Sequence, residues 1–396
     1  FTNLYLSFKN VIILHIMNNL ISIKNISKKE KSIKIEWNDG EISYFHFLWL
    51  RDNCPSGIHP TARQRSFNLL SVSEKIHPTN FKIINDKKLE IEWSEGNHKS
   101  FYDLNWLRNH CYTISNNKKY NSPYILWDSK LNKKLKSISI EHTDVMNNDD
   151  GLIKWLEKLH YYGISIIKNA PVEKKSALKI LNRISHIRET FFGSPFEVIN
   201  IPNPNNTAYS AEALRNHTDL PYYEYAPGYQ FLHCLVNDAT GGMSSAVDGF
   251  KVADFLKKND TDTYNILKKT NVKFKDNDYT QETIRIYHSP LITLTKDDDY
   301  NDIRFSVATM AAVDCYPEIM DNFYQAYYKF TKMLHDEKFT IKFRLEPGDI
   351  FCFNNRRILH GRTEFDPNSG HRHLQGYYID RDEIISRLNF LKKIDI

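Results

Sequence analysis

The alternation of apolar and polar positions divides the chain into two parts. From residue 21 to about residue 112, short runs alternate residue by residue and are separated by tight turns, as in SIKIEW and EISYFHF on either side of Asp39-Gly40. Alternation of this kind is typical of half-buried strands, and an Asp-Gly pair between two such runs predicts a hairpin. We detect no internal repeat of twenty to fifty residues. The pattern predicts a small β-rich N-terminal domain.

Helical spacing of apolar residues appears only in the second part of the chain. Three helices are predicted from Leu152, Trp155, Leu156 and Leu159, from Leu178, Leu181, Ile184 and Ile187, and from Phe323, Tyr327, Phe330 and Leu334. Between and after them lie the strand-like runs GYQFLHCLV, KFTIKFRL, IFCF, RRILHG and RHLQGYYI. Strands with short turns and a few flanking helices favour an α+β architecture whose core is a β-barrel or sandwich.

The domain boundaries follow from composition. Residues 115–145 are polar, rich in Lys and Asn and weakly periodic, which predicts an extended linker. We therefore expect an N-terminal domain over 17–114 and a second domain over 146–396. Because the chain opens on Phe1 and its first methionine is Met17, residues 1–16 are expected to be a non-native or disordered extension.

Composition excludes several classes of protein. The 396 residues are 41% hydrophobic and 26% charged, an ordinary globular balance that excludes global disorder. A net charge of +5 gives no nucleic-acid footprint, and the apolar run from Val11 to Leu14 is too short to span a membrane. Five scattered cysteines suit reduced thiols better than a disulfide framework. We expect a cytoplasmic protein that binds neither nucleic acid nor membrane.

Candidate chemistry concentrates in two segments. In RNHTDLP, an extended backbone places the side chains of His217 and Asp219 on one face, where they can share a metal ion. A lone His-x-Asp pair is weak evidence, since a histidine bonded within a turn gives the same pattern. His360 in FNNRRILHGR is the candidate third ligand. Two histidines and one carboxylate leave three positions of an octahedron open, the pattern of non-haem Fe(II) oxygenases.

A co-substrate with a remote carboxylate would need a fixed cation. Arg372 follows His360 after the turn DPNSG, at the start of the run RHLQGYYI. A guanidinium can pair with a buried carboxylate through two parallel hydrogen bonds. The other interpretation of Arg372, a solvent-exposed arginine on a strand, becomes less favourable once the His-Asp-His set is present.

Three stretches together resemble the gamma-butyrobetaine dioxygenase family, part of the taurine dioxygenase superfamily of Fe(II)- and 2-oxoglutarate-dependent oxygenases. They are FLWLRDNCP, NHTDLPYYEYAPGYQFLHCLVNDATGGMSSAVDGF and LEPGDIFCFNNRRILHGRTEFDPNSGHRHLQGYYIDRDEIISRL. The similarity extends from about residue 21 to about residue 393, and the trimethyllysine dioxygenases are the sister family. The resemblance implies a double-stranded β-helix (jelly-roll) catalytic domain behind a small β-rich N-terminal domain.

The resemblance also implies roles for individual residues. His217, Asp219 and His360 match the iron ligands, and Arg372 with Ser244 matches the pair that holds the distal carboxylate of 2-oxoglutarate. The family binds a small trimethylammonium substrate in an aromatic cage, where cation–π attraction holds the cation. The resemblance implies such a cage in this chain. Its positions fall on Phe192, Phe196, Tyr209 and Tyr378, with Asn206 as a polar contact. The two phenylalanines replace Tyr and Trp of the animal enzymes, and Leu220 replaces a Tyr.

The N-terminal domain departs from the family pattern at its metal site. Animal members hold a structural zinc through a Cys-rich loop, whereas RDNCPSGIHPTARQR keeps only Cys54. Cys54, His59 and His98 would make an irregular, weak site, and we do not expect zinc here. The resemblance further implies a homodimer.

The function implied is hydroxylation of gamma-butyrobetaine to L-carnitine, with O₂ as oxidant, release of succinate and CO₂, and ascorbate as a possible reductant. One alternative is hydroxylation of trimethyllysine or another betaine, where a free amino acid would need an acidic partner for its ammonium group. A second alternative, from a different class, is a non-catalytic barrel that binds a metal or a small cation.

Overall fold

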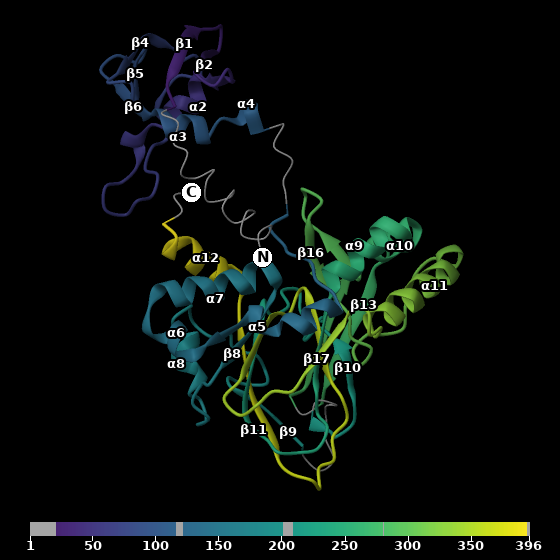
Figure 1. Ribbon diagram of the computed structural model, residues 1–396. Helices are drawn as coiled ribbons and strands as arrows, with labels where there is room; N and C mark the ends of the chain where they lie inside the picture. Colours follow the sequence, from purple (N-terminus) through teal and green to yellow (C-terminus); the bar gives the residue numbers. More distant parts are fainter. Residues whose placement is uncertain (1–20, 116–121, 201–208, 280, 394–396) are drawn as a thin grey trace. The chain divides into compact units, whose positions relative to one another are not determined.

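The chain forms two compact units in the computed structural model, residues 1–121 and 122–396 (Figure 1). The structure describes residues 21–115, 122–200, 209–279 and 281–393. The expected extension at residues 1–16 lies outside the described residues. Within the described ranges, no helix is both long and apolar enough to cross a membrane.

The N-terminal unit consists of two three-stranded antiparallel sheets, each followed by a short helix. The first sheet contains β1 (Ile23–Lys28), β2 (Ser32–Trp37) and β3 (Ile42–His46), and α2 (Phe47–Asp52) follows it. The second sheet contains β4 (Pro78–Ile84), β5 (Lys88–Trp93) and β6 (Lys99–Asp103), followed by α3 (Leu104–Asn109) and α4 (Tyr112–Ser115). Gly40 has a φ of +86°, as the predicted hairpin between β2 and β3 requires.

The two sheets of this unit repeat one another, at a spacing (Ile33 to Leu89) longer than the twenty to fifty residues for which no repeat was detected. IKIEW in β2 corresponds to LEIEW in β5, and LWLRDNC after β3 corresponds to NWLRNHC after β6. In both copies the tryptophan that ends the motif donates its indole N–H to a serine hydroxyl on the next strand, at 2.7 and 2.8 Å. The arginine of each helix pairs with an acidic residue of the other copy, as Arg51 with Glu95 and Arg108 with Asp39. The repeat is hard to see because the second turn is one residue longer and few identities remain outside the two motifs.

Two sheets, whose strands are mostly antiparallel, form the centre of the second unit. The six-stranded sheet has the order β7-β8-β18-β11-β20-β9, and the four-stranded sheet has the order β10-β19-β12-β17. The strands of the first are β7 (Ser139–Glu141), β8 (Ile164–Lys168), β9 (Phe196–Ile199), β11 (Tyr229–Asn237), β18 (Ile350–Asn354) and β20 (Arg372–Ile379). Those of the second are β10 (Leu214–His217), β12 (Ser244–Asp248), β17 (Thr340–Phe343) and β19 (Ile358–Arg362).

The inner faces of the two sheets share one hydrophobic core. Cys234, Phe351 and Leu374 of the six-stranded sheet pack in one cluster with Ala246 and Ile341 of the four-stranded sheet. β18 is buried on both faces, which explains its continuous apolar run IFCF, and β11 and β20 are buried at most positions although they include polar residues. The predicted mainly β second domain with flanking helices is confirmed.

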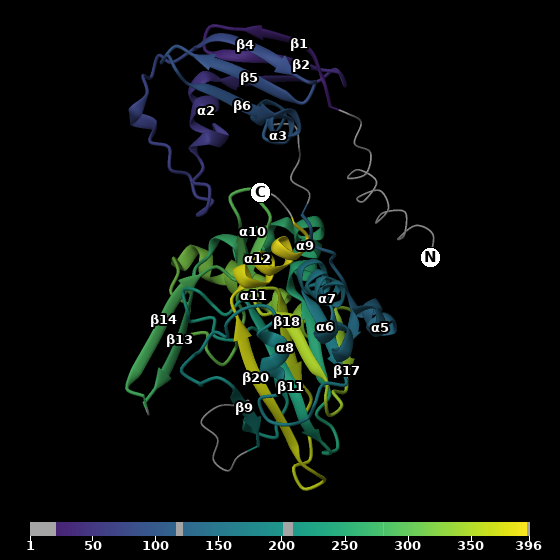
Figure 2. The ribbon, with the colours of Figure 1, turned by 90° about the vertical axis from the view of Figure 1, so that its left-hand side faces the viewer.

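Helices cover the outer face of each sheet (Figure 2). On the six-stranded sheet these are α7 (Asp149–Tyr162), α8 (Ala177–Leu181) and α12 (Arg381–Leu391), while α5 (Leu135–Ile138) and α6 (His142–Asn147) precede α7. Against the four-stranded sheet pack α9 (Gly249–Asn259), α10 (Thr261–Lys269) and α11 (Pro317–Leu334). Two further hairpins complete the unit, β13 (Val272–Asp278) with β14 (Thr283–Ser289) and β15 (Ile292–Leu294) with β16 (Tyr300–Ile303).

The predicted helices and linker differ from the structure in two places. The helices around Leu152 and Phe323 are present as α7 and α11, but α8 ends at Leu181, where backbone bonds from residues 183 and 184 tighten the chain into turns. The expected linker differs more, because residues from 122 onward belong to the second unit. Trp127, Leu131 and Ile138 within it are buried in the core between the sheets, which a polar sequence around three apolar residues did not reveal.

Candidate metal centre and substrate cavity

The two candidate histidine ligands lie opposite each other on neighbouring strands. β10 and β19 are antiparallel, and their register pairs His217 with His360. The centroids of the two imidazole rings are 4.4 Å apart. On its other side, the ring of His360 packs against Phe353, 4.6 Å between centroids. Strand pairing therefore brings together two residues that are far apart in the sequence.

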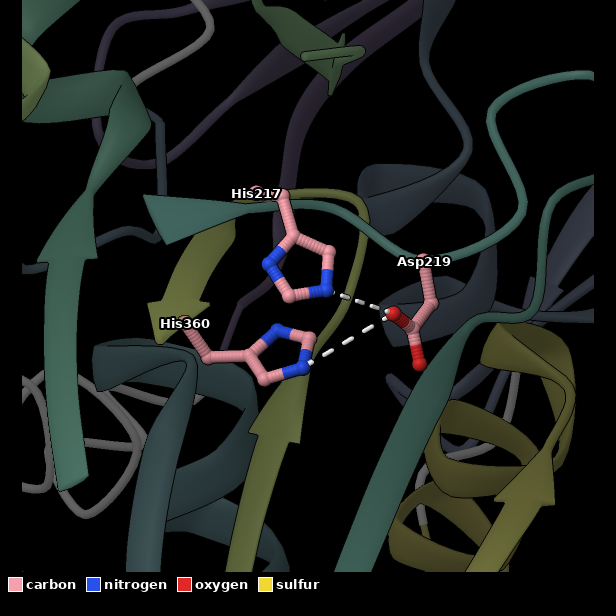
Figure 3. Close-up of side chains that lie close together, drawn as sticks. All are labelled: His217, Asp219 and His360. Atoms are coloured by element: carbon pink, nitrogen blue, oxygen red, sulfur yellow. Dashed lines mark ion pairs between the residues drawn. The ribbon is translucent and has the colours of Figure 1, made fainter. Parts of the chain in front are cut away.

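Asp219 completes the cluster immediately after β10. Its Oδ1 atom is 3.1 Å from His217 Nε2 and 3.7 Å from His360 Nε2, and Figure 3 shows both rings directed toward this carboxylate. One ligand atom from each residue lies within 4.8 Å of the others. In the described part of the chain this is the one group of three or more His, Cys, Asp or Glu side chains with such spacing.

The hydrogen bonds around His217 show that the cluster fits a cation. Its Nδ1 atom is 2.8 Å from the carbonyl oxygen of Arg215, so this nitrogen carries the ring proton and donates it to that carbonyl. Nε2 faces the Asp219 carboxylate at 3.1 Å. Burial lowers the pKa of His217, but the hydrogen bond to Asp219 and the charge of that carboxylate outweigh it and raise the pKa. The carboxylate therefore favours a positive charge beside Nε2, which a proton supplies in the metal-free chain and which a divalent metal with imidazole and carboxylate ligands would supply in its place.

The electrostatics of the cluster agree with ligand function. Burial alone would raise the pKa of Asp219, but the imidazoles of His360 and His217 and the hydroxyl of Tyr378 outweigh it and hold that pKa well below its usual value. Burial lowers the pKa of His360 to about 3, and the neighbouring His217 adds to the effect. At neutral pH the carboxylate is therefore ionised and the His360 ring is neutral, the forms that bind metal.

A cavity of about 320 Å³ opens beside the cluster, lined by His217 and Asp219. The four aromatic residues expected in the cage line the same cavity: Phe192, Phe196, Tyr209 and Tyr378. The ring of Phe196 stacks on that of Tyr378 with centroids 5.0 Å apart, and Phe192 lies 6.3 Å from Phe196. Leu220 also lines this cavity, whereas Asn206 lies outside the described residues.

Of the two predicted 2-oxoglutarate residues, Arg372 lines a different cavity from the His-Asp-His cluster, and Ser244 lines neither. Arg372 lies in a second cavity of about 430 Å³, and its buried Nε atom has no hydrogen-bond partner within the described chain. Burial and the nearby Arg362 lower the pKa of Arg372 to about 10, so it remains a cation at neutral pH without a bonded anion. Ser244 is buried and pairs in register with Arg362 on β19. Gly242, two residues before Ser244, lies directly against the Arg372 side chain.

The expected weak zinc ligands come together only in part. Cys54 Sγ lies 3.4 Å from His98 Nε2 and 3.1 Å from the hydroxyl of Ser56. His59 instead accepts a hydrogen bond from the backbone N–H of Ala62 within its own loop. The third side chain is therefore directed into its own loop rather than to the Cys54–His98 pair.

Three features of the site were not predicted from the sequence. The hydroxyl of Tyr378 donates to Asp219 Oδ2 at 2.6 Å, so this cage residue also contacts a candidate ligand. Tyr222 lines the cavity and is buried. Asn355 brackets the backbone of Asp219. The motif FNNRRILHGR contains Asn355, but nothing in its spacing indicates which backbone the amide contacts.

The fold and the His-Asp-His cluster together define a class of enzyme. Residues 128–378 match the family described as "Taurine catabolism dioxygenase TauD, TfdA family", and residues 24–108 match "Gamma-butyrobetaine hydroxylase-like, N-terminal". The chain belongs to the TauD, TfdA family of dioxygenases. The predicted superfamily and enzyme class are confirmed.

Individual relatives include gamma-butyrobetaine and trimethyllysine dioxygenases. The chain is 37% identical to a gamma-butyrobetaine dioxygenase of Pseudomonas sp. (strain AK-1), over 91% of this chain and 94% of that protein. It is 32% identical to the human gamma-butyrobetaine dioxygenase, with the same coverage of both chains. A trimethyllysine dioxygenase of Meyerozyma guilliermondii is 28% identical, over 91% and 93% of the two chains. Among solved structures, a taurine dioxygenase from Burkholderia xenovorans matches 61% of this chain and 87% of its own with a TM-score of 0.46 and 12% identity.

Proposed function

We propose that this chain is an Fe(II)- and 2-oxoglutarate-dependent oxygenase that hydroxylates gamma-butyrobetaine to L-carnitine, with release of succinate and CO₂. The observation that carries the proposal is that the His-Asp-His cluster and four aromatic residues line or adjoin one cavity. A ligand set for iron beside a cage for a trimethylammonium group matches the chemistry of that reaction. Relatives at 37% and 32% identity are gamma-butyrobetaine dioxygenases.

Each group has a defined task in this reaction. His217, Asp219 and His360 would hold the iron and leave positions open for the keto acid and O₂. Bound iron supplies the redox chemistry, in which the keto acid is oxidatively decarboxylated and the substrate gains a hydroxyl. Arg372 and Ser244 hold the far carboxylate of 2-oxoglutarate. The cage fixes the substrate's cationic end and orients its C–H bond toward the iron.

The lining of the cavity favours gamma-butyrobetaine over trimethyllysine. A free amino acid presents an ammonium group that needs an acidic partner, and Asp219 is the only carboxylate residue among the described lining residues. That carboxylate is engaged with the histidines and Tyr378. Arg215, Ser306 and Thr309 also line the cavity and offer a cation and hydroxyls to a substrate carboxylate. The non-catalytic alternative is disfavoured because all three ligands and Arg372 are present.

The proposal is tested with purified enzyme, Fe(II), ascorbate and 2-oxoglutarate. Oxygen is admitted in the presence of gamma-butyrobetaine, trimethyllysine or glycine betaine, and succinate and hydroxylated product are measured. We expect coupled turnover with gamma-butyrobetaine and its loss in the His217→Ala variant. Coupling of succinate release to trimethyllysine but not to gamma-butyrobetaine would overturn the assignment.

We also propose a cytoplasmic location and a homodimer, each from a single argument. The cytoplasmic location rests on the five scattered cysteines, which suit reduced thiols. The homodimer rests on the family resemblance alone, and sedimentation velocity of the purified chain tests it.

A further inference from the structure

The side-chain amide of Asn355 brackets the backbone of the candidate ligand Asp219. Its Oδ1 atom accepts from the Asp219 N–H at 2.7 Å, and its Nδ2 atom donates to the Asp219 carbonyl at 3.0 Å. A further bond from Nδ2 reaches the carbonyl of Pro227 at 3.2 Å. Asn355 is 1% exposed. β10 ends at His217, so Asp219 has no strand pairing there. The Asn355 side chain supplies the two backbone hydrogen bonds that a neighbouring strand would otherwise make.

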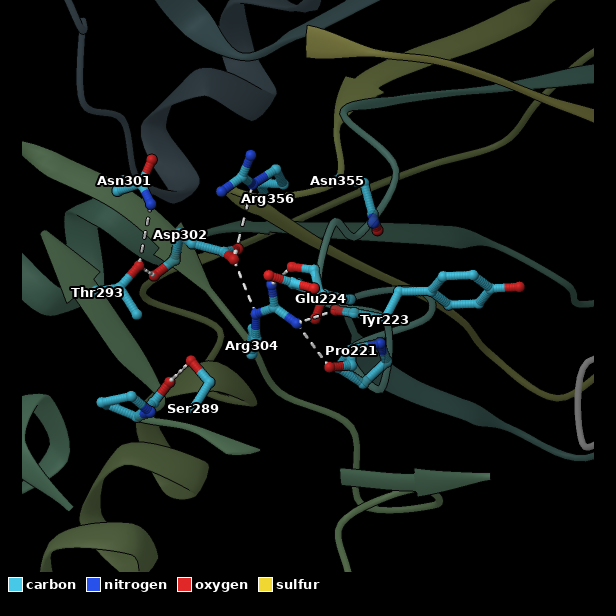
Figure 4. A network of polar contacts seen from close by, with 12 residues as sticks. Pro221, Tyr223, Glu224, Ser289, Thr293, Asn301, Asp302, Arg304, Asn355 and Arg356 are labelled. Atoms are coloured by element: carbon cyan, nitrogen blue, oxygen red, sulfur yellow. Dashed lines mark hydrogen bonds and ion pairs between the residues drawn. The ribbon is translucent and has the colours of Figure 1, made fainter. Parts of the chain in front are cut away.

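The chain that follows Asp219 is held in an unfavourable conformation. Leu220 has a φ of +54°, in the left-handed region that costs free energy for a residue with a β-carbon. The next turn is fixed from a different segment, since the Arg304 guanidinium donates to the carbonyls of Pro221 and Glu224, each at 2.7 Å (Figure 4). Such a conformation persists only where its surroundings define it, and Asn355 anchors the end nearest the ligand.

The two oxygens of the Asp219 carboxylate face different groups. Oδ2 of Asp219 accepts from the Tyr378 hydroxyl, whereas Oδ1 is the atom that faces both histidines. The hydrogen bonds from Asn355 fix the position of the Asp219 backbone, from which the side chain extends. The hydrogen bond from Tyr378 fixes the rotation of the carboxylate group. Asn355 also lies in the turn between β18 and β19, five residues before His360. The turn that contains Asn355 therefore precedes the strand that carries His360 and also binds the backbone of Asp219.

We propose that Asn355 is a positioning residue that presents Asp219 Oδ1 to the metal held by His217 and His360. This rests on the proposed function only in so far as the cluster binds a divalent metal. Without the amide, the N–H and carbonyl of Asp219 lose their partners, the turn at Leu220 relaxes, and the carboxylate leaves its place between the imidazoles. Partners of this kind, one shell outside the ligands, change metal affinity by about 10- to 100-fold.

The test measures Mn(II) binding to the metal-free full-length chain, without substrate or keto acid. Free Mn(II) is read from its EPR signal during titration, for the wild type and for the variants Asn355→Ala and Asn355→Asp. Asn355→Asp keeps the size of the side chain and an acceptor for the Asp219 N–H, but it loses both donors. The matched control is Asn354→Ala, because Asn354 is the adjacent residue, is also buried, and accepts from the backbone of Arg356 rather than contacting Asp219.

We expect both Asn355 variants to bind Mn(II) at least tenfold more weakly, with Asn354→Ala within twofold of the wild type. Equal affinity of folded Asn355 variants and wild type, or an equal loss in Asn354→Ala, would overturn the positioning role while leaving the metal centre intact. If neither Asn355 variant folds and Asn354→Ala does, Asn355 serves folding and the proposal is wrong. A wild type that binds Mn(II) no better than His217→Ala would remove the metal centre itself, and with it both proposals.

Discussion

Gly376 on β20 lies directly opposite Phe196 on β9, and replacing it with alanine tests whether the aromatic cage binds the substrate. A β-carbon at position 376 would fall 2.5 Å from Cε1 of Phe196 and closer still to two other ring atoms. Carbon atoms in contact stand about 3.5–4.0 Å apart, so the ring must move by roughly 1 Å or more. Because this ring stacks on Tyr378, the movement opens the cage.

The magnitude follows from the contacts that are lost. A cation–π contact is worth about 0.5–2 kcal/mol, which corresponds to a rise of about 2- to 30-fold in the KM for the trimethylammonium substrate. The KM for 2-oxoglutarate should not change, because Arg372 lines a different cavity from Phe196. Overpacking should also lower the free energy of unfolding by about 1–3 kcal/mol.

The assay compares Gly376→Ala, Phe196→Ala and the double variant by succinate release over a range of gamma-butyrobetaine concentrations. In the double variant the missing ring makes room for the new methyl group, so its KM should equal that of Phe196→Ala alone, and the two effects should be far from additive. A folded Gly376→Ala enzyme with unchanged KM and unchanged stability would refute the reasoning, because it would mean that Phe196 does not fix the substrate from this position.

Two other predictions concern Arg372 and His233. Arg372→Ala should raise the KM for 2-oxoglutarate by about 10²- to 10³-fold, the equivalent of about 3–4 kcal/mol for leaving a buried carboxylate without its partner, with Arg372→Lys between it and wild type; an unchanged KM contradicts this role. Burial lowers the pKa of His233 to about 4, and its ring is fully buried, so the unfolded chain takes up the proton first as pH falls. Stability from this group is therefore full above pH 6.5 and lost toward pH 4, by about 3 kcal/mol. Urea unfolding at both pH values should show a smaller loss for His233→Leu than for wild type and for the exposed control His186→Leu, and equal losses would count against it.

Much of the fold was predictable because its signals are local. The periodicity around Leu152 and Phe323 identified α7 and α11, and the apolar runs identified β11, β18 and β20. The N-terminal repeat was not found from the sequence because its spacing exceeds fifty residues and only two short motifs carry it. The segment 122–145 was misread because a few buried side chains, such as Trp127, decide its place while most of its residues remain polar.

The identities of His217, Asp219 and His360 and of the aromatic residues already limit the site to a metal and a small cation. How these groups are arranged depends on the folded chain. The register of β10 against β19 places the two imidazoles opposite each other, and hydrogen bonds from Asn355 and Tyr378 hold the backbone and carboxylate of Asp219 beside them. These contacts join residues more than a hundred positions apart, and no local pattern encodes them because strand pairing and side-chain packing arise only when the whole unit has folded.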